Sequence, residues 1–330
     1  MAYSLAEKLR QKPHISVDIA AVDFADHTFL ISTVKDEEAL ANSLEFAGLL
    51  HPVWLHPLGA KYRIISGFRR VAACLRNGWE TIPALLAGDD FSAFELVQLA
   101  VLDNNSCRPL NALEEARAVA LLRRYAPDET SLKHVLTKTG LSQNPKHLAK
   151  LEKLLGLPIT TLNAVAADLI PLAVAEELAA FPNDAAMRFT EIFIKGKVGL
   201  NRQREFIRLV FELSRLKDLE LSAVFALPEF NAIWRGAEDD QRRKALLLLE
   251  WLYQARYPHI TAAREQARKK IADLGLDNRI RLNMPENFEN LRHSLSFGFE
   301  SQAELLEILD LCLQMAVNPT LAKLFAREEV

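Results

Sequence analysis

The stretch from Tyr62 to Leu86, YRIISGFRRVAACLRNGWETIPALL, constrains the fold more than any other part of the chain. It reads as an apolar strand, a Ser-Gly break, two arginines, a helix ended by glycine, and a second strand. The first N–H groups of such a helix have no internal partners, and the helix dipole there favours negative charge. Arg69 and Arg70 add guanidinium forks that match phosphate oxygens. The pattern predicts an anion site at this turn; two solvated arginines paired with surface acids would give the same spacing.

The composition excludes several classes of protein. The chain has 330 residues, 50% of them hydrophobic and 25% charged, which is enough for two or three folded domains and indicates neither a disordered nor a membrane protein. No apolar run is long enough to cross a bilayer, and the start, MAYSLAEKLRQKPH, has no signal-peptide core. The cysteines, Cys74, Cys107 and Cys312, lie far apart and the histidines are scattered, so we expect a reducing cytoplasm and assign no metal. We expect Cys74 to be a buried small apolar residue rather than a nucleophile.

The order of elements indicates an α+β multidomain protein that is mostly helical. Residues 1–108 read as a small α/β domain with short strands at 28–32, 52–55, 62–66 and 82–87. Two capping boxes, Ser92 with Glu95 and Asn111 with Glu114, open helices near its end. Residues 109–215 read as short helices separated by Gly, Pro or Asn, which is typical of a helix-turn-helix bundle.

The last region, residues 216–330, starts with helices and then changes character. RIRLNM and LRHSLSFGF alternate like strands, and SQAELLEILDLCLQMA is an amphipathic helix with more apolar surface than one hairpin covers. This strand–strand–helix module must pack on the preceding helices or on a second copy of the chain. Both alternatives stay open from the sequence.

Charge is uneven along the chain. Only residues 109–215 are positive, with 15 Lys+Arg against 12 Asp+Glu, and Lys133–Lys153 holds five lysines and one glutamate. In PKHLAKLEKLLGL, Leu148, Leu151 and Leu155 share one helix face, and the lysines at 146, 150 and 153 share another. Such a stripe suits a phosphate backbone, although an ordinary solvated face has the same pattern.

Several segments, in order, resemble the ParB chromosome- and plasmid-partition family. GLLHPVWLHP…KYRIISGFRRVAACLRNGWETIPALL resembles the family's first box, with I-x-x-G-E-R-R before a helix and G-x-x-x-I-P-A after it. LDNNSCRPLNALEEARA resembles the second box, E-N-x-Q-R-x-x-L-x-P-x-E-x-A, and LSQNPKHLAKLEKLLGLP resembles the helix-turn-helix. The end of the chain resembles the dimerisation module. The resemblance implies an N-domain with the fold shared by ParB and sulfiredoxin.

The resemblance also implies a ligand. ParB-type N-domains bind CTP with Mg²⁺ and close as a clamp on DNA. In this chain the residues implied to bind nucleotide are Ser66, Gly67, Arg69, Arg70 and Asn104. Asp103 and Asn104 stand in the place of the family's Glu-Asn and are the candidates for ordering magnesium or an attacking water.

The catalytic box departs from the family pattern. Phe68 stands where the family has Glu, Ala72 where a further Arg is usual, and Ser106 and Cys107 replace the Gln-Arg pair. These departures favour nucleotide binding over turnover. Activity as a CTPase-like hydrolase is the most that the box allows, and whether the protein is an enzyme stays open.

The helix-turn-helix implies contact with duplex DNA. The candidate DNA-binding residues form two groups, the first around the recognition helix and the second after it: Gln143, Asn144, Lys146, His147, Lys150 and Lys153, then Lys195, Lys197, Arg202 and Arg204, with Arg208 beyond them.

Three functions follow from these expectations. The leading one is a ParB-like, nucleotide-gated DNA-binding protein that acts in DNA partition or transcriptional regulation, in the cytoplasm and associated with the nucleoid. The second is a nucleotide-hydrolysing or phosphotransfer enzyme on the same N-domain. The third is a non-catalytic dimeric scaffold with a vestigial pocket. The expected partners are duplex DNA and a second copy of the chain, with no membrane; a partner ATPase stays open.

Overall fold

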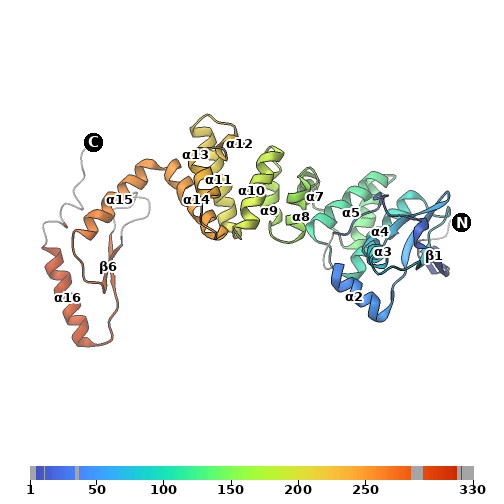
Figure 1. Ribbon diagram of the computed structural model, residues 1–330, viewed down its shortest axis with the longest axis horizontal. Coiled ribbons are helices and arrows are strands. Elements are labelled where there is room, and N and C mark those ends of the chain that lie inside the picture. Colours follow the sequence, from blue (N-terminus) through green and yellow to red (C-terminus); the bar gives the residue numbers. More distant parts are fainter. Residues whose placement is uncertain (1–4, 11, 34–36, 284–292, 318–320, 322–330) are drawn as a thin grey trace. The chain divides into compact units, whose positions relative to one another are not determined.

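The computed structural model describes residues 5–10, 12–33, 37–283, 293–317 and 321 (Figure 1). The chain divides into two compact units. Unit 1 comprises Met1–Ile207 with Glu238–Ala245, and unit 2 comprises Arg208–Ala237 with Leu246–Val330. Among the described residues, no helix has both the length and the apolar character needed to cross a bilayer.

Unit 1 begins with a small mixed sheet. After helix α1 (Leu5–Arg10), its strands are β1 (His14–Asp18), β2 (Val22–Asp23), β3 (Val53–Leu58), β4 (Lys61–Ser66) and β5 (Thr81–Leu86). The order across the sheet is β1-β5-β3-β4-β2. β3 runs parallel to β5 and antiparallel to β4, β2 runs parallel to β4, and β1 runs antiparallel to β5. The predicted strands at 52–55, 62–66 and 82–87 are confirmed as β3, β4 and β5.

Helices α2 (Glu37–Ala47), α3 (Phe68–Arg76) and α4 (Ala93–Cys107) complete the α/β domain. The central strands are apolar and fully buried at Val53, Leu55, Ile64 and Ile82. Cys74 is also fully buried, and burial raises the pKa of its thiol to about 11. The expectation that Cys74 is a core residue is confirmed.

The strand expected at residues 28–32 is wrong. Ile31 is fully buried, but within the described chain this segment lies outside every strand. Arg117 of the next helical region donates Nη1–H to the carbonyl oxygens of Ile31 and Ser32, at 3.3 and 3.0 Å. The Arg117 guanidinium group therefore donates to carbonyl oxygens that a neighbouring strand would otherwise have paired. A buried backbone carbonyl needs a hydrogen-bond partner, but that partner does not have to belong to a strand.

The helical part of unit 1 follows directly. Its helices are α5 (Ala112–Tyr125), α6 (Glu129–Thr139), α7 (Pro145–Leu154), α8 (Ile159–Ala166), α9 (Leu172–Leu178), α10 (Asn183–Lys195) and the start of α11 (Leu200–Leu216). Both expected capping boxes are present, at the start of α4 and of α5. Phe189, Phe193 and Phe206 form the aromatic centre of the later helices. The described chain is therefore mostly helical and contains a small five-stranded sheet in unit 1, as expected.

Unit 2 is helical and ends in the expected strand–strand–helix module. Its helices are α12 (Leu221–Val224), α13 (Pro228–Arg235), most of α14 (Gln241–Arg256) and α15 (Pro258–Ala272), and the module is β6 (Ile280–Asn283), β7 (Ser294–Phe297) and α16 (Gln302–Ala316). β6 pairs antiparallel with β7. Arg279 binds Asp277 and Glu307, at 2.9 and 3.2 Å, and so ties the start of β6 to α16.

Candidate functional site

The turn between β4 and α3 has the geometry that the sequence predicts. β4 ends at Ser66, and Gly67 caps α3 with φ of 103°, in the left-handed region. A Cβ atom at Gly67 would lie 2.7 Å from Val53 Cγ1, so a side chain there meets both strain and a clash. Glycine is therefore required for the chain to turn from the sheet into the helix.

Three elements bring polar side chains together at this turn. Ser66 Oγ donates to Asp103 Oδ2 at 2.6 Å, and Arg70 Nη2 donates to the same oxygen at 2.7 Å. Asn104 Nδ2 lies 3.3 Å from Ser66 Oγ. These residues come from β4, α3 and the last turn of α4, so four predicted site residues form one hydrogen-bonded cluster, which we call the phosphate-turn cluster: Ser66, Arg70, Asp103 and Asn104.

Arg70 is held in place from two directions. Besides Asp103, it donates to the carbonyl oxygens of His51 and Pro52, at 3.0 and 2.8 Å. The side chains of Arg70 and Asp103 are 18% and 23% exposed, so the ion pair lies at the surface without being fully solvated. Sequence reasoning missed the part played by residues 51 and 52, because a backbone carbonyl acceptor has no residue signature.

The two residues before Arg70 in α3 are Phe68 and Arg69. Arg69 is the second residue of α3 and is half-buried. Phe68 is 6% exposed, and its ring centroid lies 6.2 Å from that of His27. An apolar core residue therefore occupies the position of the family's Glu and supplies no acid or base.

The end of α4 also contacts the helix-turn-helix. Asn105 Nδ2 donates to the carbonyl oxygen of Thr139, the last residue of α6, at 2.6 Å. In a helix, successive side chains differ by about 100° in direction, so Asn105 points away from the side that carries Asp103. The last turn of α4 therefore touches the phosphate-turn cluster on one side and α6 on the other. No sequence signal identified this contact.

A second buried cluster joins the α/β domain to α5. Glu114 is fully buried, and it accepts hydrogen bonds from Arg108 at 2.6 and 2.7 Å and from Thr33 N and Oγ1 at 2.8 and 2.9 Å. The backbone N–H of Asn111 adds a further bond at 3.2 Å. Burial acts to raise the pKa of Glu114, but these hydrogen bonds outweigh it and lower the pKa to about 2. The carboxylate therefore holds two parts of the chain together as an anion.

The predicted helix-turn-helix is formed by α6, the segment 140–144 and α7. Asn144 caps α7 by accepting from Lys146 N at 2.9 Å, and Gln143 Nε2 donates to Thr137 Oγ1 at 2.6 Å. His147 Nε2 lies 3.1 Å from Glu115 Oε1. Gln143 and Asn144 therefore stabilise the turn, and His147 links α7 to α5.

The inner face of α7 differs slightly from the prediction. Leu148, Leu151 and Leu154 are buried, while Leu155 is only half-buried. The helix ends at Leu154, and Leu155 is its C-cap residue, with backbone angles that are still in the right-handed helical region. The lysines keep to the outside.

The predicted DNA-binding cations fall into two sets. In the paired set, Lys150 binds Glu176, Lys195 binds Glu191 and Arg204 binds Glu177, at 2.7, 2.8 and 2.8 Å. In the unpaired set, the side chains are exposed and have no ion-pair partner among the described residues: Lys146, Lys153, Lys197 and Arg202. Arg208, in unit 2, binds Glu212 and the Tyr257 hydroxyl, both at 3.1 Å.

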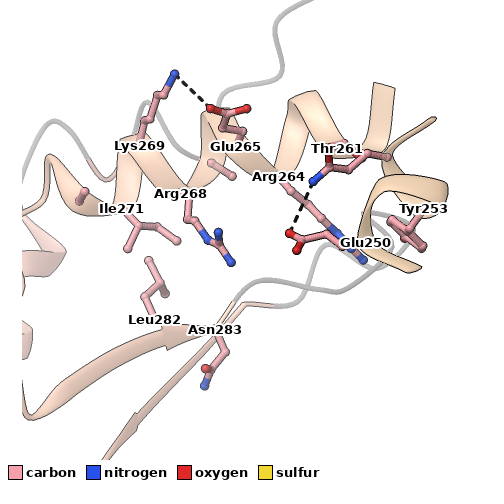
Figure 2. A pocket seen from close by; sticks show the side chains of 13 residues that line it. Glu250, Tyr253, Thr261, Arg264, Glu265, Arg268, Lys269, Ile271, Leu282 and Asn283 are labelled. Carbon is pink, nitrogen blue, oxygen red and sulfur yellow. Dashed lines mark hydrogen bonds and ion pairs between the residues drawn. The ribbon is translucent and has the colours of Figure 1, made fainter. Parts of the chain in front are cut away.

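Unit 2 contains an open groove between α15 and β6 (Figure 2), with a volume of about 1030 Å³. Ile271 and Leu282 face each other across it, and Arg268 projects into the space between helix and strand. Arg264 lies over the ring of Tyr253, 5.2 Å from its centroid. In the described part of the chain, no cluster of three or more His, Cys, Asp and Glu side chains is suited to hold a metal ion.

The class of the protein is defined by its fold: a small α/β domain, with a glycine turn between β4 and α3, joined to a helix-turn-helix. Comparison with known families gives the particular one: residues 16–105 match the ParB N-terminal domain. This part of the chain is a ParB N-terminal domain, and the resemblance seen in the sequence is confirmed.

Curated relatives agree with this assignment. The chain is 30% identical over 154 residues to a nucleoid occlusion protein of Shouchella clausii, covering 44% of this chain and 51% of that protein. It is 31% identical over 159 residues to the chromosome-partitioning protein Spo0J of Thermus thermophilus, covering 48% and 56%. The chain spans about half the length of these relatives.

Solved ParB structures also resemble the chain at low similarity. A C-terminally truncated ParB from Caulobacter crescentus, complexed with CTP-γ-S, has 21% identity and a TM-score of 0.26, covering 55% of this chain and 99% of that one. A Pnob8-like ParB-N domain has 16% identity and a TM-score of 0.33, covering 72% and 98%.

Proposed function

We propose that this protein is a ParB-like DNA-binding protein that acts in DNA partition and is associated with the nucleoid. The proposal includes a nucleotide, CTP with Mg²⁺, at the phosphate-turn cluster. The observation that carries it is the convergence of Ser66, Arg70, Asp103 and Asn104 inside the matched ParB N-terminal domain. A relative named as a chromosome-partitioning protein supports the cellular role.

The donor set fits a phosphate ligand. The first N–H groups of α3, the hydroxyl of Ser66 and the guanidinium of Arg70 are all hydrogen-bond donors, and the helix dipole adds partial positive charge. Gly67 leaves the turn free of a side chain. Bound magnesium would neutralise phosphate charge, and Asp103 with Asn104 would supply the carboxylate and amide oxygens beside it.

The same site gives little support to hydrolysis. Phe68 is an apolar core residue, and the Asp103 carboxylate already accepts hydrogen bonds from Ser66 and Arg70. Both of these hydrogen bonds go to Oδ2 of Asp103. We therefore favour binding without fast turnover over the hydrolase and phosphotransferase alternatives.

The contact between Asn105 and Thr139 supports gating of DNA binding by nucleotide. A ligand that binds at Asp103 and Asn104 acts on the same helical turn that holds the end of α6. Because coupling between two sites is reciprocal, DNA should also change the affinity for nucleotide.

The test is calorimetry with CTP, ATP and GTP plus Mg²⁺, in the presence and absence of generic duplex DNA. Tight binding of one nucleotide, strengthened or weakened by DNA, is the expected result. No binding of any of the three at millimolar concentration would refute the nucleotide site. No salt-dependent binding of duplex DNA would refute the DNA-binding function and leave the scaffold alternative.

We further propose that the strand–strand–helix module forms a homodimer. On α16, Leu306, Leu309 and Leu313 are 61%, 43% and 68% exposed, which is more apolar surface than a solvated helix carries. The helix has acidic residues and no lysine or arginine, so like charges on two copies must be kept apart or paired with cations elsewhere. A second copy, related by a two-fold axis, is the occupant we favour for this surface.

Light scattering tests the dimer on the full chain and on a truncation ending near Asp273. A dimeric full chain and a monomeric truncation are expected. A full chain that is monomeric at tens of micromolar would rule out the dimer, and a truncation that stays dimeric would place the interface elsewhere.

A further inference from the structure

Two adjacent carboxylates on α9 hold cations from two other helices. Glu176 Oε2 lies 2.7 Å from Lys150 Nζ on α7, and Glu177 Oε1 lies 2.8 Å from Arg204 Nε on α11. We call these residues the α9 acid pair. The helix is anchored by the buried side chains of Val174, Ala175 and Leu178, so the acid pair has a fixed position in unit 1.

Both captured cations belong to the surface expected to bind DNA. On α7 itself, Lys146 and Lys153 are exposed and have no ion-pair partner in the described part of the chain, while Lys150, one helical turn from Lys146, is paired. The same contrast holds on α11, where Arg204 is paired and Arg202 has no ion-pair partner among the residues that the structure describes. The acid pair therefore occupies one cation on α7 and one on α11, beside cations that have no ion-pair partner among the described residues.

The captured cations can still be released. The side chains of Lys150 and Arg204 are 41% and 59% exposed, and those of Glu176 and Glu177 are 30% and 32% exposed. Ion pairs with this exposure contribute only about 0–1 kcal/mol. Duplex DNA presents about one negative charge per 1.7 Å, so it competes for each cation, but the carboxylate left behind repels the phosphates.

We propose that the α9 acid pair restrains the DNA affinity of this protein by withholding Lys150 and Arg204 from the phosphate backbone. This proposal rests on the proposed DNA-binding function. In it, Lys146, Lys153, Lys197 and Arg202 make the phosphate contacts of the wild-type protein. Glu176 and Glu177 set how much of the remaining basic surface takes part.

The experiment is a double-mutant cycle in the full-length protein. DNA affinity is measured by fluorescence anisotropy with generic duplex across a salt series, for wild type, Glu176→Gln, Lys150→Ala and the double variant. Lys150→Ala should weaken binding about twofold or less in the wild type but about five- to tenfold in the Glu176→Gln background, where the lysine is free to contact phosphate. Glu176→Gln alone should strengthen binding and steepen the salt dependence by about 0.9 in the log–log slope.

A matched cycle controls for the loss of negative charge alone. Glu152 lies on α7 and pairs with Arg123 at 3.0 Å rather than with Lys150. Glu152→Gln should strengthen binding slightly and be additive with Lys150→Ala, because the two residues do not share an interaction. The same design applies to Glu177→Gln with Arg204→Ala.

The outcomes separate this proposal from the one on which it rests. Wild-type protein without salt-dependent DNA binding would refute the DNA-binding function itself. If the wild type binds DNA but the Glu176–Lys150 cycle is additive, the restraint by the acid pair is refuted and the DNA-binding function is not. A strong loss of affinity from Lys150→Ala in the wild type would have the same meaning. Because each substitution is at the surface, circular dichroism and melting temperature should match those of the wild type.

Discussion

The phosphate-turn cluster and the basic surface of α7 and α11 arrange their cations in different ways. At the turn, β4, α3 and α4 converge, and every hydrogen bond of Arg70 goes to an acceptor in the same domain. On the basic surface, the cations are spread along helices, and among the described residues some have an ion-pair partner while others have none. A convergent site is preorganised, so it should lose function steeply when one member is removed. A distributed surface should lose affinity in steps.

The largest effect is expected at the turn. Replacing Arg69 and Arg70 together by Ala should weaken nucleotide binding by about 100-fold or more, because hydrogen bonds to charged groups contribute about 1.5–3 kcal/mol each. Calorimetry measures the loss. Arg76→Ala is the control, since Arg76 is exposed at the other end of α3. A double variant that binds nucleotide as the wild type does would contradict the convergent site.

The buried Glu114 cluster, which joins the α/β domain to α5, should show the next largest effect. Glu114→Gln should lower the free energy of unfolding at pH 7 by about 2–3 kcal/mol, since the pKa of Glu114 is lowered to about 2 by its hydrogen bonds. A carboxyl with a lowered pKa stabilises the fold above its unfolded pKa. That stabilisation is lost as pH falls from about 5 towards 2.

Urea unfolding at several pH values measures this difference. The difference in the free energy of unfolding between wild type and variant should become smaller as the pH is lowered. Glu129→Gln is the control, because Glu129 is exposed and its ion pair with Lys133 is long, at 3.9 Å. A gap that is independent of pH would show that the lost contacts do not depend on the carboxylate charge.

A smaller, graded effect is expected on the basic surface. Replacing Lys146 and Lys153 by Ala should weaken DNA binding about tenfold and lower the log–log salt slope by about 1.8, since each phosphate contact contributes about 0.9. The loss should be similar for all duplex sequences, because phosphate contacts position the protein without reading bases. Anisotropy titrations with several duplexes measure it. Unchanged affinity would indicate that the DNA-binding surface lies instead at the group around Arg202.

The smallest effect tests whether the two regions communicate. Asn105→Ala removes one hydrogen bond to Thr139 O, and it should reduce the influence of nucleotide on DNA affinity by about fivefold, since such a bond contributes about 1 kcal/mol. Binding of each ligand alone should change little. Asn77→Ala is the matched control, because Asn77 makes the same kind of bond to Ala41 O at 2.9 Å.

The influence of nucleotide is measured as the ratio of DNA affinities with and without it. An Asn105→Ala variant with the wild-type ratio would show that α4 transmits nothing through this contact. A change in the Asn77→Ala ratio would instead indicate a general loss of rigidity in the domain.

The sequence by itself determined the local features of this protein. The sequence predicted strand β4, the glycine turn and α3 correctly. Gly67 and the apolar alternation of residues 62–66 affect the backbone only within a few residues, so no distant contact was needed. The capping boxes at Ser92 and Asn111 were readable for the same reason. The resemblance to the family motifs also predicted that Asp103 belongs to the site.

Only the tertiary structure decided which groups meet. Residues 28–32 carry the apolar pattern of a strand, yet Arg117, far along the chain, supplies their backbone partner. Lys146 and Lys150 look equivalent in sequence, but only Lys150 meets a carboxylate of α9. Propensity and periodicity describe one segment at a time, whereas burial, ion pairing and backbone satisfaction depend on what the rest of the fold places beside it.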